Sequence, residues 1–147
     1  MKHQTKLAAA MGLMLGIAPA FADDDPLSGD PVAGARVFNQ CQACHVVQND
    51  AGETLAGRAA KTGPNLHNVN GRQAGTVDGF RYSDSIVEAG EAGLVWDEET
   101  FVAYVQDPTG FLREYLDNRR ARGNMAYRLR DAGDATDLYA YLASLQQ

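Results

Sequence analysis

The residues with the clearest chemical potential stand together in the stretch Cys41-Gln42-Ala43-Cys44-His45, which contains both cysteines of the chain. Two thiols three positions apart lie on the same face of a helical turn. Each thiol can add to one vinyl group of a haem, and the adjacent histidine then reaches the iron from the same side. This spacing is typical of the attachment of a c-type haem. The stretch therefore predicts one covalent haem c, held by Cys41 and Cys44, with His45 as an iron ligand.

Two other chemistries use the same residue types. A Cys-x-x-Cys pair in an exported protein could be a redox disulfide, but that role expects a thioredoxin-like βαβ pattern, which the sequence lacks. A zinc site needs four nitrogen or sulfur ligands. Four residues could supply them on paper: Cys41, Cys44, His45 and His67. Haem is favoured because it also explains an export signal and a later methionine, and the disulfide and zinc readings remain alternatives.

Iron in an electron carrier usually has a second protein ligand, and the chain offers few candidates. Beyond the N-terminal export signal, Met125 is the only methionine, and His67 is the only histidine besides His45. A thioether ligand favours ferrous iron and raises the potential. Met125 follows His45 by 80 residues, enough for the chain to wrap a haem and return on its opposite face. We expect His45–Met125 ligation; a bis-histidine site with His67 and a core-filling role for Met125 are the alternatives.

The first 22 residues have the order of a secretory signal peptide. Lys2 and Lys6 precede an uncharged apolar run over 7–18, and Ala20-Phe21-Ala22 forms a small-x-small cleavage site. A membrane anchor, the alternative, needs about 20 apolar residues, which is longer than this run. We therefore expect cleavage after Ala22, export to the periplasm, and a single mature domain over 23–147.

The charge of the expected mature chain is acidic and uneven. The mature chain has 11 basic and 19 acidic residues, a formal charge of −8, which argues against a nucleic-acid partner. Residues 113–130 hold six arginines and two acids, a local charge of +4. Such asymmetry gives a small protein a dipole that orients it toward a charged partner. The alternative is a solvated basic loop that binds nothing.

Helices and long loops must position these residues, because the sequence has no period-2 strand pattern of any length. Residues 49–63 are predicted to form a polar loop, and residues 63–75 irregular turn structure with several glycine and proline breakers. The predicted fold class is therefore all-α, with loops folded over a cofactor.

Four helices are predicted from capping residues and apolar spacing. Asp30-Pro31 should cap and open a helix that runs into the cysteine pair. Asp97-Glu98-Glu99 should open a second helix, which Asp107-Pro108 should end. A short helix is expected over 111–118, and a last helix should open at Asp134.

Over almost its whole expected mature length, the chain resembles the class I c-type cytochromes, and within them the bacterial cytochrome c2 and c550 group. The matching segments follow the family's order. They are Gly34, Phe38, Cys41–His45, Lys61–His67, Gly71-Arg72, Gly79–Asp84, Leu94–Thr100, Tyr104, Pro108, Met125–Tyr127 and Asp137–Leu142. The resemblance implies the class I cytochrome c fold around one haem. It also implies that Gly34 and Phe38 pack the first helix against Leu138 and Tyr141 of the last.

The resemblance further implies how the iron ligands are supported. The Pro64 carbonyl would accept a hydrogen bond from Nδ1 of His45, which fixes the ring and tunes its donation to iron. Tyr104 would lie near the sulfur of Met125.

The haem propionates would also have defined partners. Arg72, Tyr82 and Trp96 would surround them, because a buried carboxylate is costly unless it receives hydrogen bonds. The chain departs from its relatives here, since Gly123 stands where many have a threonine whose hydroxyl bonds a propionate.

The implied function is transport of single electrons by a monomer, without a small-molecule substrate. The donor would be the cytochrome bc1 complex, and the acceptor a photosynthetic reaction centre or a cytochrome oxidase. Docking would be transient, through a basic face made of Lys61, Arg119, Arg120, Arg122, Arg128 and Arg130. A haem peroxidase and a gas sensor are the alternatives. Both need an open iron position, which Met125 would block.

Overall fold

Helices arranged around irregular loops make up the computed structural model, which describes residues 27–146. The expected signal peptide lies outside the described residues. The elements are α1 (Pro31–Val37), η1, a 3-10 turn (Phe38–Gln40), β1 (Val46–Gln48), β2 (Thr54–Gly57), α2 (Asp84–Glu91), α3 (Glu98–Gln106), α4 (Pro108–Tyr115) and α5 (Ala132–Ser144). The all-α prediction is confirmed, with a small hairpin added. No helix within 27–146 is long and apolar enough to cross a membrane.

The capping residues start two helices where the sequence predicts. The Asp30 side chain accepts a hydrogen bond of 2.8 Å from the N–H of Val32, and Pro31 occupies the first turn of α1. The Asp97 side chain accepts a hydrogen bond of 2.8 Å from the N–H of Thr100. The Thr100 hydroxyl in turn accepts a hydrogen bond of 3.0 Å from the N–H of Asp97. This reciprocal capping box satisfies N–H groups that have no partner inside α3.

The predicted starts of the last two helices are wrong by two or three residues. Asp107 ends α3 and also caps α4, because its side chain accepts 3.1 Å from the N–H of Gly110. Pro108, which cannot continue α3, is therefore the first residue of α4. Asp131 caps α5 by accepting 3.0 Å from the N–H of Asp134, which lies inside the first turn and does not open the helix.

Three elements were not predicted from the sequence: the strands β1 and β2 and the helix α2. The strands β1 and β2 pair in an antiparallel hairpin, so part of the predicted loop over 49–63 is strand. Val46 and Val47 are both buried and a bulge follows them, which removes the alternation that identifies a strand. Helix α2 follows Ser83, a common cap residue whose hydroxyl makes no capping bond here, and no helix was predicted from the sequence over 84–91.

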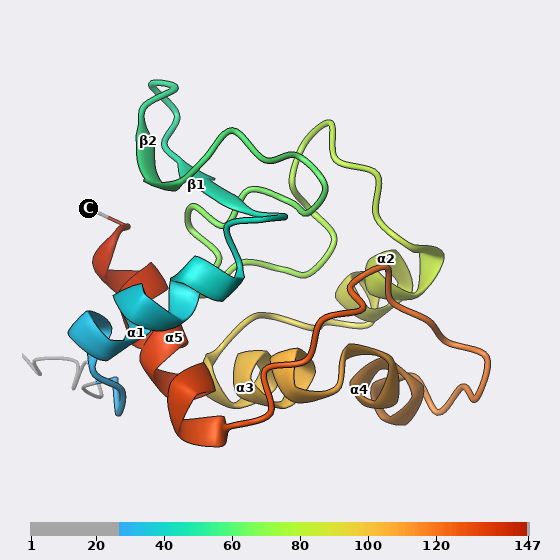
Figure 1. Cartoon of the computed structure of the whole chain (residues 1–147). Helices are drawn as coiled ribbons and strands as arrows, with labels where there is room; N and C mark the ends of the chain where they lie inside the picture. The colour runs from blue at the N-terminus through green and yellow to red at the C-terminus, as the bar shows by residue number, and fades with distance from the viewer. Residues whose placement is uncertain (1–26, 147) are drawn as a thin grey trace, which may run out of the picture.

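The contact between α1 and α5 brings the two ends of the described chain together, as Figure 1 shows at its left side. A Cβ on Gly34 would lie 1.9 Å from the carbonyl oxygen of Asp137, so only glycine permits this approach. The rings of Phe38 and Tyr141 lie 5.8 Å apart between the two helices. The expected packing of Gly34 and Phe38 against Tyr141 is confirmed.

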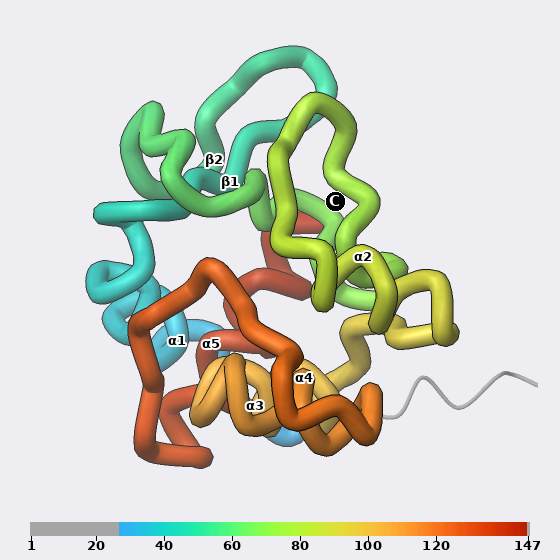
Figure 2. Tube along the Cα trace, turned by 90° about the vertical axis from the view of Figure 1, so that its right-hand side faces the viewer, coloured from blue at the N-terminus to red at the C-terminus, as the bar shows by residue number. Residues whose placement is uncertain are grey.

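The segment between α4 and α5 is long and contains no helix or strand. In Figure 2 it is the orange tube that crosses in front of α3 and α4 and reaches toward α1. It carries Met125, which is partly buried and packs against the hydrophobic core. The fold thus brings Met125 to the same core against which Cys41 packs.

Candidate haem-attachment site

The cysteine pair lies on a single helical turn that continues η1. The N–H of Cys41 donates to the carbonyl of Phe38 at 2.8 Å, and the N–H groups of Cys44 and His45 donate to the carbonyl of Cys41 at 3.0 and 2.9 Å. Neither cysteine forms a disulfide with a described residue, and Cys41 is partly buried whereas Cys44 is exposed. The turn therefore presents two adjacent thiols and the histidine together, as attachment to two vinyl groups requires.

The structure weighs against the two alternative chemistries for these residues. Burial, with a smaller effect from Cys44, raises the pKa of the Cys41 thiol to about 11. A redox dithiol needs a thiol with a lowered pKa, because the thiolate is the reactive form. Over residues 27–146, no three His, Cys, Asp or Glu side chains gather closely enough to hold a metal ion, so the zinc site with His67 does not form.

The His45 ring is held in one orientation. Its Nδ1 lies 2.9 Å from the carbonyl oxygen of Pro64. A carbonyl only accepts hydrogen bonds, so Nδ1 carries the hydrogen and the lone pair of Nε2 is free to bind a metal. Burial lowers the pKa of His45, and the bond to Pro64 opposes this shift. The contact implied by the family resemblance is present.

Gly63 is a functional residue whose contact the sequence does not reveal. A Cβ at this position would lie 2.4 Å from Cε1 and 2.6 Å from Nδ1 of His45. The N–H of Gly63 also donates to the carbonyl of Cys44 at 2.7 Å. The backbone therefore lies directly against the imidazole. The available signal was its position just before Pro64, but only the fold shows which ring it contacts.

Arg72 and its neighbours leave donors that no described residue satisfies. Its two terminal nitrogens donate to the carbonyls of His67 and Asn65 at 2.6 and 3.2 Å, while Nε is buried without a partner. Burial lowers the pKa of Arg72, and Tyr82 opposes this shift. The hydroxyl of Ser83 is the other buried side-chain atom without a partner among the described residues. A buried guanidinium N–H without a partner fits an anionic group of a cofactor, such as a haem propionate.

Trp96 belongs to the same cluster through the backbone. Its N–H donates to the carbonyl of Arg72 at 2.9 Å, and its side chain is buried. The structure thus brings together Arg72, Tyr82 and Trp96, which the resemblance assigns to the propionates. Ser83 was missed at the sequence level, because a serine before a helix usually predicts only a cap.

Tyr104 lies beside the segment that carries Met125. A Cβ on Gly123 would lie 3.5 Å from the Tyr104 hydroxyl, which is ordinary contact distance. The Tyr104 ring also packs against Trp96, with centroids 4.9 Å apart. Burial raises the pKa of Tyr104 to about 12. Tyr104 therefore lies between Trp96 and the segment that carries Met125, and its phenol stays neutral.

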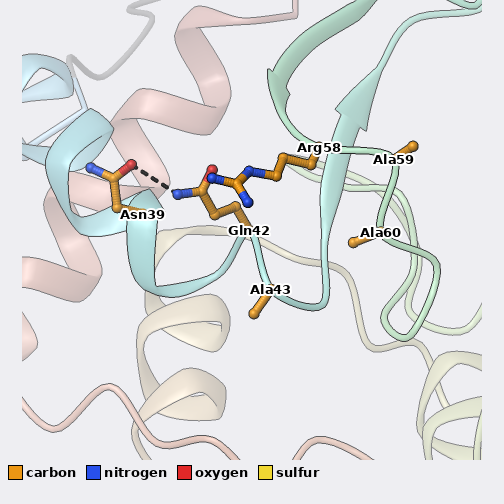
Figure 3. Close-up of a pocket in the computed structure, with 6 residues that line it drawn as sticks. All are labelled: Asn39, Gln42, Ala43, Arg58, Ala59 and Ala60. Carbon is orange, nitrogen blue, oxygen red and sulfur yellow. Dashed lines mark hydrogen bonds between the residues drawn. The ribbon is translucent and has the colours of Figure 1, made fainter.

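The outer surface of the attachment turn forms an open hollow of about 540 Å³ (Figure 3). Gln42 donates to the side chain of Asn39 at 3.2 Å on one wall, and the Arg58 side chain extends beside Gln42 from the other. Arg58 is exposed, three residues before Lys61. It adds a positive charge next to the attachment turn, beyond the six residues predicted to form the basic face.

A helical fold around one Cys-x-x-Cys-His turn, with unpaired donors for a dianionic cofactor, defines a mono-haem c-type cytochrome. No protein-family model matches the chain. The chain is 62% identical to cytochrome c2 of Rhodovulum adriaticum over 81% of this chain and 94% of that protein. It is 52% identical to cytochrome c2 of Cereibacter sphaeroides over 97% and 95%. The crystal structure of cytochrome c2 from Rhodobacter sphaeroides matches with a TM-score of 0.78 at 55% identity, over 80% of this chain and 96% of that one.

The chain belongs to the cytochrome c2 group of the class I c-type cytochromes. It is a mono-haem electron carrier, and its one haem c is attached through Cys41 and Cys44. Ligation by one histidine and one methionine is typical of this family. The sequence-level prediction of fold, cofactor and family is confirmed.

Proposed function

We propose that the protein is a periplasmic shuttle that takes one electron from the cytochrome bc1 complex and delivers it to a photosynthetic reaction centre or a terminal oxidase. In this proposal His45 and Met125 are the axial ligands of the iron. When bound, haem c supplies an iron that accepts and releases one electron without a change of ligands. The expected signal peptide supports the periplasmic location.

The protein's own residues would keep the site rigid around the haem. Pro64 fixes the tautomer and orientation of His45 through the 2.9 Å contact to Nδ1. Arg72 and Ser83 offer buried donors to the propionates, and buried Trp96 excludes water beside them. A site that is already ordered needs little rearrangement when the charge changes.

The observation that carries the partner proposal is the exposed positive charge on the segment before Pro64 and on the segment that carries Met125. All six residues of the basic face are exposed: Lys61, Arg119, Arg120, Arg122, Arg128 and Arg130. Among the described residues only Arg128 forms an ion pair, at 2.8 Å with Asp107. The arginines flank Met125, whereas Lys61 and Arg58 belong to the segment before Pro64. On an otherwise acidic protein, this arrangement orients the haem edge toward an acidic partner surface.

The salt dependence of electron transfer tests this proposal. We expect the second-order rate constant with purified bc1 complex to fall as ionic strength rises, because salt screens charges on the two surfaces. The double variant Arg119→Gln, Arg120→Gln should react about tenfold more slowly at low salt and match the wild type at high salt.

The double variant Arg119→Lys, Arg120→Lys keeps both charges and serves as the matched control, with a rate near that of the wild type. Rates that do not respond to salt, or a glutamine variant as fast as the lysine variant, would overturn the docking proposal.

A further inference from the structure

The segment that carries Met125 has very few polar contacts with the rest of the protein. Residues 123–126 make no hydrogen bond with any described residue, through either backbone or side chain. The segment is fixed at its two ends. The N–H of Arg122 donates to the Ser85 hydroxyl at 3.0 Å, and the N–H of Leu129 donates to the Val105 carbonyl at 2.9 Å. Between these ends, packing and two side-chain contacts hold the segment. The first is the exposed ion pair of Arg128 with Asp107 at 2.8 Å.

The second contact is a hydrogen bond from the Tyr127 hydroxyl to the side-chain oxygen of Gln40, and of the two it is the one that reaches the residue before Cys41. The two residues are 87 positions apart, so the bond joins distant parts of the chain. Gln40 directly precedes Cys41, where the haem is attached, and Tyr127 follows Met125 by two residues. The Tyr127 side chain is 43% exposed, so the bond lies at the surface and not in the core.

We propose that the Tyr127–Gln40 hydrogen bond is a clamp that positions Met125, by tying the methionine segment to the haem-attachment turn. The inference rests on Met125 being an iron ligand, as proposed above. A ligand segment whose only other polar tie is one half-exposed ion pair can move away from the iron whenever its packing loosens. The clamp opposes that motion, because moving the segment must also break the bond to Gln40.

The phenol ring and the hydroxyl have separable roles. A Tyr127→Phe variant keeps the ring and its packing and removes only the donor. A Gln40→Ala variant removes the acceptor together with the rest of the side-chain amide. If the clamp acts as one unit, each change alone should break it completely. Met125 should then dissociate no more readily in the double variant than in either single variant. Two unrelated surface effects would instead add.

The measurement is methionine dissociation in the haem-loaded protein. A net hydrogen bond of ordinary strength corresponds to about a fivefold change in an equilibrium constant. Each single variant should therefore lose the weak long-wavelength band of methionine-ligated ferric haem at a pH about 0.7 unit lower than the wild type. Imidazole added to the ferric protein should bind about fivefold faster, because its entry waits for methionine to leave.

Tyr115→Phe is the matched control, because Tyr115 is an exposed tyrosine at the end of α4 whose hydroxyl makes no hydrogen bond with a described residue. This variant should behave as the wild type. Single variants indistinguishable from the wild type, or a double variant whose effect is the sum of the two, would overturn the clamp. A wild-type protein that lacks the methionine band altogether would instead overturn the ligand assignment, so the two failures are distinguishable.

Discussion

At the scale of single residues, the position of the His45 ring depends on Gly63 having no side chain. Gly63 lies against the His45 ring so closely that one added methyl group would overlap three ring atoms, at 2.4 to 2.8 Å. Real Cβ contacts do not reach such distances, so either the backbone or the ring must move. Because Pro64 follows directly and accepts the bond from Nδ1, a shift of the backbone also shifts the acceptor.

We therefore expect Gly63→Ala to lower the free energy of unfolding of the haem-loaded protein by about 2 kcal/mol, since overpacking costs roughly 1–3 kcal/mol. The same change should alter the midpoint potential, because the hydrogen bond to Nδ1 tunes the donation of His45 to iron. Denaturant unfolding and a redox titration measure the two effects.

Gly123→Ala is the control for this substitution. A Cβ there would meet its nearest neighbour, Leu112, at 3.4 Å, an ordinary contact distance. Its effect on stability should stay within about 1 kcal/mol, and a Gly→Ala change at a compatible site is often stabilising. If both alanine variants had the same stability and potential, Gly63 would not be positioning His45.

At the scale of secondary-structure elements, the contact between α1 and α5 is fixed by backbone approach. Gly34 permits that approach, and the N–H of Asp30 donates to the Asp137 carboxylate at 2.7 Å at one end of it. Helix α1 has only seven residues, which is too short to be stable alone. Its packing on α5 therefore holds the helix that leads into the attachment turn.

The Gly34→Ala variant separates helix propensity from packing, because the two effects predict changes of opposite sign in the free energy of unfolding. Propensity alone would stabilise α1 by about 1 kcal/mol. The added Cβ would lie 1.9 Å from a carbonyl oxygen of α5, so the helices must separate, and we expect a net loss of about 3 kcal/mol. Thermal unfolding of the haem-loaded protein decides the sign. Arg36→Ala, on the exposed side of the same helix, should change stability by less than about 0.5 kcal/mol, and a stabilised Gly34→Ala would contradict the packing argument.

At the scale of the whole molecule, the local chemistry could be predicted from the residues, and the family resemblance implied some tertiary contacts, such as that of Pro64 with His45, but not the others. The attachment turn and the cap at Asp30 depend on neighbouring residues, which a sequence shows directly. The start of α4 was missed because Asp107 serves two helices at once. The roles of Gly63 and Ser83 depend on groups brought in by the fold, so no local pattern indicates them.

The tyrosines give the whole molecule a predictable response to alkaline pH. Burial is the largest cause that raises the pKa of four of them, namely Tyr82, Tyr104, Tyr139 and Tyr141, and it raises the pKa of Tyr104 to about 12. In the unfolded chain a tyrosine ionises near pH 10. Below that pH both states hold the proton, and the contribution to stability is fully present. Above it the unfolded state alone loses the proton, so stability falls until the folded pKa is reached.

For Tyr104 alone, this linkage predicts that the free energy of unfolding falls by about 1 kcal/mol between pH 10 and pH 11. Denaturant unfolding of the haem-loaded ferrous protein at several pH values measures the slope. The variant Tyr104→Phe keeps the ring that packs on Trp96 and removes the ionisable group, so its stability should fall less steeply over the same interval. Equal slopes for the variant and the wild type would mean that the phenol ionises as readily in the folded site as in the unfolded chain. That result would contradict the conclusion that burial beside the methionine segment keeps Tyr104 neutral.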